Sequence, residues 1–192
     1  MHSSKGRIRI IGGQYRSRLL RVAARPGLRP TPDRVRETLF NWLGQDLSGA
    51  ACLDLFAGSG ALGFEAASRG AARVVMIESD RGALSELEAS RTALGATQVE
   101  VLRGSAEAYL DTARERFDVV FLDPPFRQNA VPKLLARLPR VLNSRARVYA
   151  ESARPVDAPE GWHELKGARA GGVSYQLFEW GGNDSSDLPR NV

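Results

Sequence analysis

The sequence predicts an α/β protein: a mostly parallel seven-stranded sheet with antiparallel C-terminal strands, preceded by a small N-terminal extension. Two observations support this prediction. From residue 50 onward, apolar runs typical of buried strands alternate with helical stretches over short connections, which is the pattern of a parallel sheet with helices on both faces. After Glu151 the alternation stops, and two further strand-like runs flank a glycine-rich loop, as expected for an antiparallel pair at the sheet edge.

The order of the elements follows from this pattern. Strand-like runs lie at residues 51–56, 73–77, 98–102, 117–122 and 146–150, with the C-terminal pair at 162–166 and 173–180. Helical stretches separate the first five runs at residues 61–69, 81–94, 105–113 and 129–138. We therefore expect three regions: an extension at residues 1–44, a main domain at residues 45–181 and a polar, flexible tail at residues 182–192.

The composition excludes several classes of protein. The chain of 192 residues has one cysteine and two histidines, which excludes an internal disulfide and leaves no zinc-binding set, so we expect no metal. No apolar run approaches the roughly 18 residues of a membrane helix. The segment Met1–Arg9 is basic and lacks the apolar centre of a secretion signal. We therefore expect a cytoplasmic protein that contacts no membrane and is a monomer.

The positive charge is concentrated at the N-terminus. The whole chain carries 27 Lys and Arg against 22 Asp and Glu, a net charge of +5. Residues 1–42 hold ten basic side chains, nine of them arginines, against Asp33 and Glu37, whereas the remaining 150 residues are net acidic. Because arginine binds phosphate through a planar, bidentate group, the extension is predicted to bind nucleic acid.

A β-hairpin is expected around the Gly12-Gly13 pair. The segments on both sides of the pair alternate polar and apolar residues, typical of two strands joined by a two-residue turn. With such a turn, two pairs of arginines oppose each other on one face: Arg9 with Arg16, and Arg7 with Arg18. Opposed arginines repel unless a polyanion neutralises them, so this face is predicted to contact phosphates; the alternative is a solvated face.

A helix is expected after the proline-rich connector that follows the hairpin. Thr31 is a suitable N-cap, Pro32 a suitable first helical residue, and Gly44 can end the helix. The apolar residues at helical spacing form one face that we expect to be buried: Val35, Leu39, Trp42 and Leu43. Arg34 and Arg36 lie off this face and are further candidates for phosphate contact.

A glycine-rich turn ends the first strand of the main domain. Gly58, Gly60 and Gly63 open the following helix with the spacing of a dinucleotide-binding turn, and Glu78 ends the next strand twenty residues after Gly58. Glycines let the backbone approach a ligand closely, and a carboxylate at this strand end can accept hydrogen bonds from ribose hydroxyls. The pattern predicts a nucleoside cofactor and leaves its identity open.

Two carboxylates argue against a dinucleotide: Asp54 suits a cofactor with an amino group, and Asp123 lies in a loop that suits a planar base. Asp54 stands four residues before Gly58, where its charge would repel a pyrophosphate. Asp123-Pro124-Pro125-Phe126 follows the fourth strand, at the edge of the sheet where ligands bind. Because prolines have no N–H to donate, this loop offers acceptors beside an aromatic ring. Such a loop is complementary to a planar base with an exocyclic amine.

Four blocks of the sequence together resemble one family. They are Arg7–Gln14 (RIRIIGGQ), Pro30–Trp42 (PTPDRVRETLFNW), Leu53–Gly63 (LDLFAGSGALG) and Phe121–Arg127 (FLDPPFR). The last two resemble class I S-adenosylmethionine-dependent methyltransferases that act on amino nitrogens. The first two more narrowly resemble the bacterial 16S ribosomal RNA guanine-N2 methyltransferases. The resemblance implies a Rossmann-like class I methyltransferase fold and a 16S rRNA substrate in the 30S subunit.

The resemblance also implies the role of each motif residue. S-adenosylmethionine would be bound by Asp54, Phe56, Gly58, Gly60, Glu78, Ser105 and Ala106. The target guanine would stack on Phe126, while the Asp123 carboxylate and the Pro124 carbonyl accept the two hydrogens of its N2 amine. The RNA would be held by the arginines of the extension: Arg7, Arg9, Arg16, Arg18, Arg34 and Arg36.

Three other functions are compatible with part of the sequence. The first keeps the cofactor and changes the acceptor to adenine N6 or cytosine N4 of DNA, or to a protein glutamine. The second is a nicotinamide-dependent oxidoreductase, which the glycine spacing favours but which leaves Asp123–Phe126 unexplained. The third is a non-catalytic RNA-binding factor, which would need neither Asp54 nor Glu78.

Overall fold

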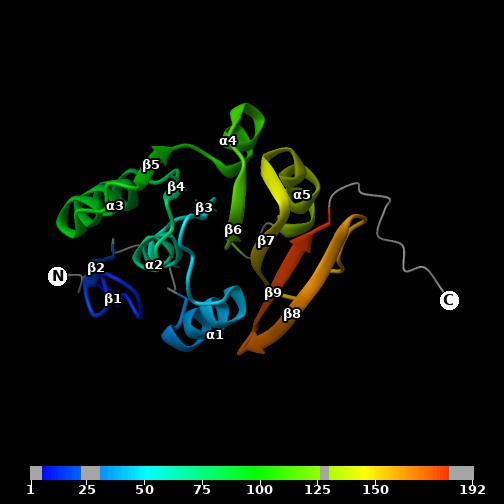
Figure 1. The fold of residues 1–192 in the computed structure, drawn as a ribbon, viewed down its shortest axis with the longest axis horizontal. Coiled ribbons are helices and arrows are strands. Elements are labelled where there is room, and N and C mark those ends of the chain that lie inside the picture. Colours follow the sequence, from blue (N-terminus) through cyan, green and yellow to red (C-terminus); the bar gives the residue numbers. More distant parts are fainter. Residues whose placement is uncertain (1–5, 23–30, 126–129, 182–192) are drawn as a thin grey trace.

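The structure is a computed structural model that describes residues 6–22, 31–125 and 130–181. Phe126 and the expected tail at residues 182–192 lie outside the described residues. No helix in the described ranges is long and apolar enough to cross a membrane. In Figure 1 the N-terminal hairpin lies toward one end of the long axis and the C-terminal strands toward the other.

A seven-stranded sheet forms the centre of the molecule, in the order β5-β4-β3-β6-β7-β9-β8. Its strands are β3 Ala51–Asp54, β4 Arg73–Glu78, β5 Val99–Arg103, β6 Phe117–Leu122, β7 Leu142–Ser152, β8 Trp162–Ala170 and β9 Val173–Trp180. The first five are parallel, and β9 is antiparallel to both β7 and β8. The predicted fold class is confirmed, including the antiparallel C-terminal strands.

Helices cover both faces of this sheet. They are α1 Asp33–Leu43, α2 Ala61–Ser68, α3 Arg81–Leu94, α4 Ala106–Thr112 and α5 Val131–Arg137, the last followed by a 3₁₀ turn at Leu138–Val141. Because side chains alternate along a strand, Cys52 packs with α1, α2 and α3 on one face while Leu53 packs with α4 and α5 on the other. The apolar residues of the N-terminal hairpin join the first of these two cores.

The hairpin has a different register from the one that the Gly12-Gly13 pair predicts. Its strands are β1 Arg7–Arg9 and β2 Leu19–Arg21, and the pairing places Arg7 opposite Arg21 and Arg9 opposite Leu19. The expected pairs, Arg9 with Arg16 and Arg7 with Arg18, are therefore wrong. Residues 10–18 instead form a longer connection between the two strands.

The reason for the longer connection is that the glycine pair packs against helix α2. The Glu65 carboxylate accepts hydrogen bonds from the N–H groups of Ile11 and Gly12, both at 2.8 Å. At the end of the same helix, the Ser68 carbonyl accepts from the Gln14 N–H at 2.7 Å. The glycines thus allow the loop to pack closely against the helix and do not form a tight turn between the strands.

Helix α1 begins one residue later than predicted. Pro32 occupies the cap position, and no side chain caps the helix. Thr31, the expected N-cap, instead directs its hydroxyl at the carboxylates of Asp123, directly after β6, and Glu151, in β7. The other end agrees with the prediction, because Gly44 has a left-handed φ of 100° and its N–H bonds the Phe40 carbonyl.

Candidate functional site

The site lies where the direction of chain winding reverses in the sheet. β3 stands between β4 and β6, and ligands of open parallel sheets bind at the carboxyl ends of strands on either side of such a point. These three strands end at Asp54, at Glu78 and at Leu122, directly before Asp123. The fold therefore gathers the three carboxylates that the sequence analysis selected.

A cavity of about 230 Å³ opens at these strand ends. Its wall includes five of the seven residues predicted to bind the cofactor, together with Asp123: Phe56, Gly58, Glu78, Ser105 and Ala106. Small residues, an aromatic ring and carboxylates share this wall. That combination suits a nucleoside, which presents a flat base together with hydroxyl donors.

Glu78 is held in place by the glycine turn. One carboxylate oxygen accepts from the Gly58 N–H at 2.8 Å, and the other accepts from the Asp80 N–H at 2.8 Å. A carboxylate at this position can accept hydrogen bonds from ribose hydroxyls. The side chain is 7% exposed, so it faces the cavity from a fixed position.

Asp54 and Gly60 lie behind the cavity wall. Asp54 is 2% exposed, and its carboxylate accepts from the N–H groups of Phe56 at 3.4 Å and Gly63 at 3.2 Å. Burial raises the pKa of Asp54 to about 7. Gly60 has a φ of +77°, and a Cβ there would lie 2.6 Å from both Leu87 and Phe64. Both residues shape the turn, and the structure does not place them on the wall.

Asp123 borders a second cavity as well as the first. This second cavity has a volume of about 240 Å³ and lies between β6, β7, the start of α1 and the loop that joins β8 to β9. Its other lining residues are Thr31, Pro32, Val35, Glu151, Ala170, Gly171, Gly172, Val173 and Tyr175. Asp123 therefore borders two separate cavities of similar volume.

Carboxylates concentrate around Asp123. Burial raises the pKa of Asp123 well above its usual value, and the neighbouring charges of Glu151 and Asp54 raise it further, whereas the bond from Thr31 lowers it. Burial also raises the pKa of Glu151, opposed by hydrogen bonds from Tyr149 and Thr31. A ligand that offers N–H donors to these carboxylates would be favoured here.

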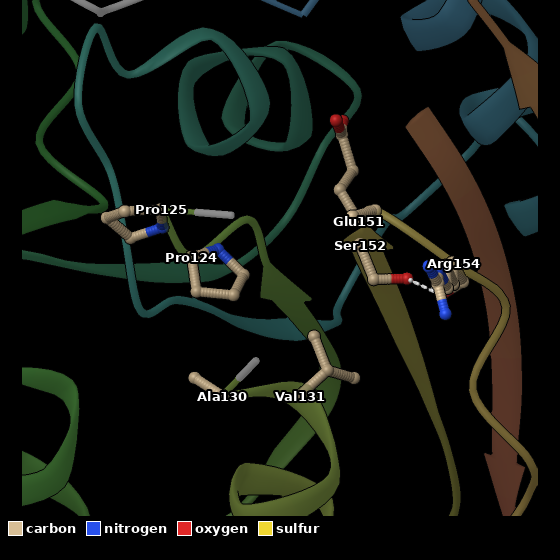
Figure 2. Close-up of a pocket in the computed structure, with 8 residues that line it drawn as sticks. Pro124, Pro125, Ala130, Val131, Glu151, Ser152 and Arg154 are labelled. Atoms are coloured by element: carbon tan, nitrogen blue, oxygen red, sulfur yellow. Dashed lines mark hydrogen bonds between the residues drawn. The ribbon is translucent and has the colours of Figure 1, made fainter. Parts of the chain in front are cut away.

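A third cavity, of about 290 Å³, borders the proline pair, and Figure 2 shows the residues that line it. Pro124 and Pro125 face Glu151 and Arg154 across it. Ala130, the residue before α5, and Val131, the first residue of α5, line it below. Glu151 thus borders both this cavity and the second one, with its carboxylate directed away from the residues of α5.

The arginines of the extension differ in accessibility. Five of the six predicted RNA-binding arginines are exposed: Arg7, Arg9, Arg16, Arg18 and Arg34. Arg36 is fully buried, and its guanidinium bonds the Arg9 carbonyl at 2.9 Å and the Asp33 carboxylate at 2.6 Å. It also lies 3.5 Å from the Glu65 carboxylate. The prediction that Arg36 contacts phosphate is therefore wrong, because this guanidinium ties the hairpin to α1 and α2.

Sequence reasoning missed four residues of this region. Thr31, Glu151 and Tyr175 line the second cavity, and Arg21 is exposed opposite Arg7 in the hairpin. Glu151 could have been found by the rule that already selected Asp123, because it stands near the carboxyl end of the neighbouring strand. Among the described residues, no group of three or more His, Cys, Asp or Glu side chains could hold a metal ion.

Comparison with known proteins shows extended similarity to one bacterial family. The family model described as conserved hypothetical protein 95 matches residues 8–179. The ribosomal RNA small subunit methyltransferase D of Escherichia coli is 43% identical, covering 97% of this chain and 96% of that protein. The protein of the same name from Haemophilus influenzae is 42% identical, covering 92% and 96%.

A solved structure agrees with these relatives. A putative methyltransferase from Escherichia coli superposes with a TM-score of 0.83 at 44% identity, covering 91% of this chain and 98% of that one. The match to the family model extends from the first strand of the hairpin through most of β9. The chain therefore belongs to the conserved hypothetical protein 95 family, together with the ribosomal RNA small subunit methyltransferase D proteins of Escherichia coli and Haemophilus influenzae.

Proposed function

We propose that this protein transfers a methyl group from S-adenosylmethionine to the N2 amine of one guanine of 16S rRNA in the small ribosomal subunit. The observation that carries the proposal is the position of Asp123 between two cavities. A group-transfer enzyme must bring a donor and an acceptor together at one point, and this carboxylate borders both spaces. The names of the relatives support rRNA as the substrate.

The residues of the first cavity fit this cofactor. Glu78 would accept from the ribose hydroxyls, and Ser105 and Ala106 would contact the adenine edge where α4 begins. Gly58 leaves room for the methionine portion, with Asp54 behind the turn. When bound, S-adenosylmethionine supplies an electrophilic methyl group on a sulfonium.

The acceptor amine would be oriented by the loop after β6. Guanine's amine is a weak nucleophile because its lone pair is delocalised into the ring. The Asp123 carboxylate and the Pro124 carbonyl accept its two N–H bonds, which directs the lone pair toward the methyl group. Such positioning can supply roughly 7 kcal/mol of a barrier. As the new bond forms, the amine becomes acidic, and its proton can pass to Asp123 or to water.

The basic extension would hold the RNA of the 30S particle or of its late assembly intermediates. We propose further that the protein acts in the cytoplasm and as a monomer. The exposed arginines of the hairpin lie on the same side of the sheet as α1, whose first residues border the second cavity. Phosphate contacts at the hairpin are thus compatible with delivery of a base toward Asp123. To reach the cavity the guanine must leave its stack, which costs a few kcal/mol unless the RNA already presents it.

Replacing Asp123 with alanine tests the assignment. We expect the variant to lose methyl transfer by at least roughly 100-fold, because the acceptor for the amine proton is gone. Its affinity for S-adenosylmethionine should stay nearly unchanged, since Glu78 and the glycine turn remain. The measurements are incorporation of labelled methyl into 30S subunits from cells that lack this protein, and calorimetric cofactor binding.

An exposed carboxylate offers a matched control. Asp157→Ala removes a carboxylate of the loop between β7 and β8 that borders none of the three cavities, and should leave both quantities unchanged. Near-normal methylation by Asp123→Ala would show that the catalytic assignment is wrong. Binding of a nicotinamide cofactor in place of S-adenosylmethionine would instead favour the oxidoreductase alternative.

A further inference from the structure

Two carboxylates from neighbouring strands converge on the second cavity. Asp123 follows β6 and Glu151 lies near the end of β7, and both line this cavity. Between them stands Thr31, whose hydroxyl oxygen is 3.5 Å from Asp123 Oδ2 and 3.2 Å from Glu151 Oε1. A hydroxyl has a single hydrogen, so Thr31 can donate fully to one of these carboxylates at a time.

Glu151 is oriented by its neighbours and keeps one oxygen available. Its Oε1 accepts from the Tyr149 hydroxyl at 2.8 Å as well as from Thr31, and the side chain is only 5% exposed. Within the described part of the chain, Oε2 has no hydrogen bond. A buried carboxylate is costly unless donors or cations surround it. The structure therefore presents a fixed acceptor at the cavity that still lacks a donor.

Asp123 is partly exposed, and its carboxylate also keeps one oxygen available. Its Oδ2 has the long bond to Thr31, and Oδ1 has no hydrogen bond among the described residues. The pair thus offers two acceptors side by side to whatever enters the cavity. An entering group with two adjacent N–H donors would stabilise both charged carboxylates and offset the burial that raises the pKa of each.

Bases differ in whether they carry adjacent donors. On guanine, the N2 amine and the protonated ring nitrogen N1 stand next to each other. On adenine and cytosine, the ring nitrogen next to the amine carries a lone pair instead. A lone pair directed at a carboxylate repels it and leaves that carboxylate without its donor, which costs more than the loss of a neutral hydrogen bond.

We propose that Glu151 determines specificity for guanine by accepting the N1–H of the target base while Asp123 accepts a hydrogen of its N2 amine. Tyr149 and Thr31 hold the Glu151 carboxylate for this contact. This inference rests on the proposed function and deepens it: the protein selects its acceptor by the protonation of the ring nitrogen beside the amine. Adenine N6 and cytosine N4 are excluded at this position.

A base analogue tests the contact between Glu151 and N1–H without changing the N2 amine. 2-Aminopurine keeps the amine at C2 but has an unprotonated N1 and no O6. The substrates are 30S particles assembled around ligated 16S rRNA, with guanosine or 2-aminopurine riboside at the nucleotide that the wild-type protein methylates. The protein variants are wild type, Glu151→Gln and Glu160→Gln, the last altering an exposed glutamate that borders none of the three cavities.

The expected result is a change in the ratio of rates. Wild type and Glu160→Gln should methylate guanosine roughly 10- to 100-fold faster than 2-aminopurine, as for the loss of a hydrogen bond to a charged group. In Glu151→Gln the ratio should fall to about threefold or less, because an amide can donate to the unprotonated N1. The missing O6 affects all three proteins alike, so it does not change the comparison.

A binding measurement accompanies the rates. With S-adenosylhomocysteine present, entry of 2-aminopurine into the cavity is followed by its fluorescence, and Glu151→Gln should bind it more tightly than wild type does. Thermal unfolding and cofactor binding of the variant check that it is folded. An unchanged ratio in folded Glu151→Gln overturns the inference while leaving the proposed function in place. If wild type does not methylate guanosine particles at all, the proposed function itself fails.

Discussion

Replacing Gly13 with alanine tests how the basic hairpin is fixed to the main domain. Gly13 has a φ of +71°, and a Cβ there would lie 1.8 Å from the Ser68 carbonyl oxygen. The oxygen belongs to the backbone of α2, so it cannot move aside as a flexible side chain would. The alanine would have to push the loop away from the helix.

The cost can be worked from the contacts that would break. The left-handed conformation alone costs an alanine about 1–2 kcal/mol. Moving the loop breaks three hydrogen bonds: Gln14 N–H to the Ser68 carbonyl, Tyr15 N–H to Ser68 Oγ, and Ser68 Oγ–H to the Gly12 carbonyl. At about 1 kcal/mol each, the total loss of stability is about 4–5 kcal/mol.

Gly95 provides the matched control. Its φ is +64°, and a Cβ there would meet nothing within 4 Å, so Gly95→Ala carries the conformational cost without the clash. Urea unfolding followed by the fluorescence of the three tryptophans gives both free energies. We expect Gly13→Ala to be less stable than Gly95→Ala by about 3 kcal/mol. If the two variants are equally stable, the close approach of the loop to α2 does not hold the hairpin.

Two further predictions concern charge. Because burial raises the pKa of Asp54 from 3.8 to about 7, the folded protein retains a proton that the unfolded chain releases between these values. The free energy of unfolding should therefore fall as pH rises from about 4 to 7. In Asp54→Asn this free energy, measured by urea titration across the same pH range, should fall less steeply. An equal slope in the two proteins would contradict the assignment. The second prediction replaces four hairpin arginines with glutamine: Arg7, Arg9, Arg16 and Arg18. This variant should bind 16S rRNA more weakly, and the slope of its log binding constant against log salt concentration should flatten by up to about one unit per arginine. The control Arg145→Gln, on β7, should change neither quantity, and unchanged binding by the fourfold variant would exclude the hairpin from RNA contact.

The main domain was predictable because its signals are local. Buried parallel strands are short apolar runs, and the connecting helices have their own periodicity, so the strands and helices from 51 to 180 lie close to the predicted ranges. The carboxylates at strand ends follow from the same pattern, because a parallel sheet brings all its carboxyl ends to one edge. Asp123 and Glu78 were therefore placed at the site without any knowledge of contacts.

The errors occur where a distant segment decides a local conformation. Gly12-Gly13 has the composition of a tight turn, but its neighbours bond Glu65 and Ser68, more than fifty residues away. Thr31 has the composition of an N-cap, yet its hydroxyl is directed at Asp123 and Glu151, 92 and 120 residues away. In the first place, bonds to the main domain replace the hydrogen bonds of a tight turn. In the second, carboxylates of the main domain replace the backbone N–H groups that an N-cap would bind.

The sequence by itself determined the α/β architecture, the glycine-rich turn after the first strand of the main domain, the position of Asp123 at a strand end and the basic character of the N-terminal segment. These properties depend on periodicity, backbone freedom and charge within a few residues. Only the tertiary structure decided which arginines are exposed, how the hairpin pairs, and that Asp123 and Glu151 face a common cavity. Those properties depend on which groups from distant segments pair through hydrogen bonds and charge. Local sequence patterns do not show which distant groups pair.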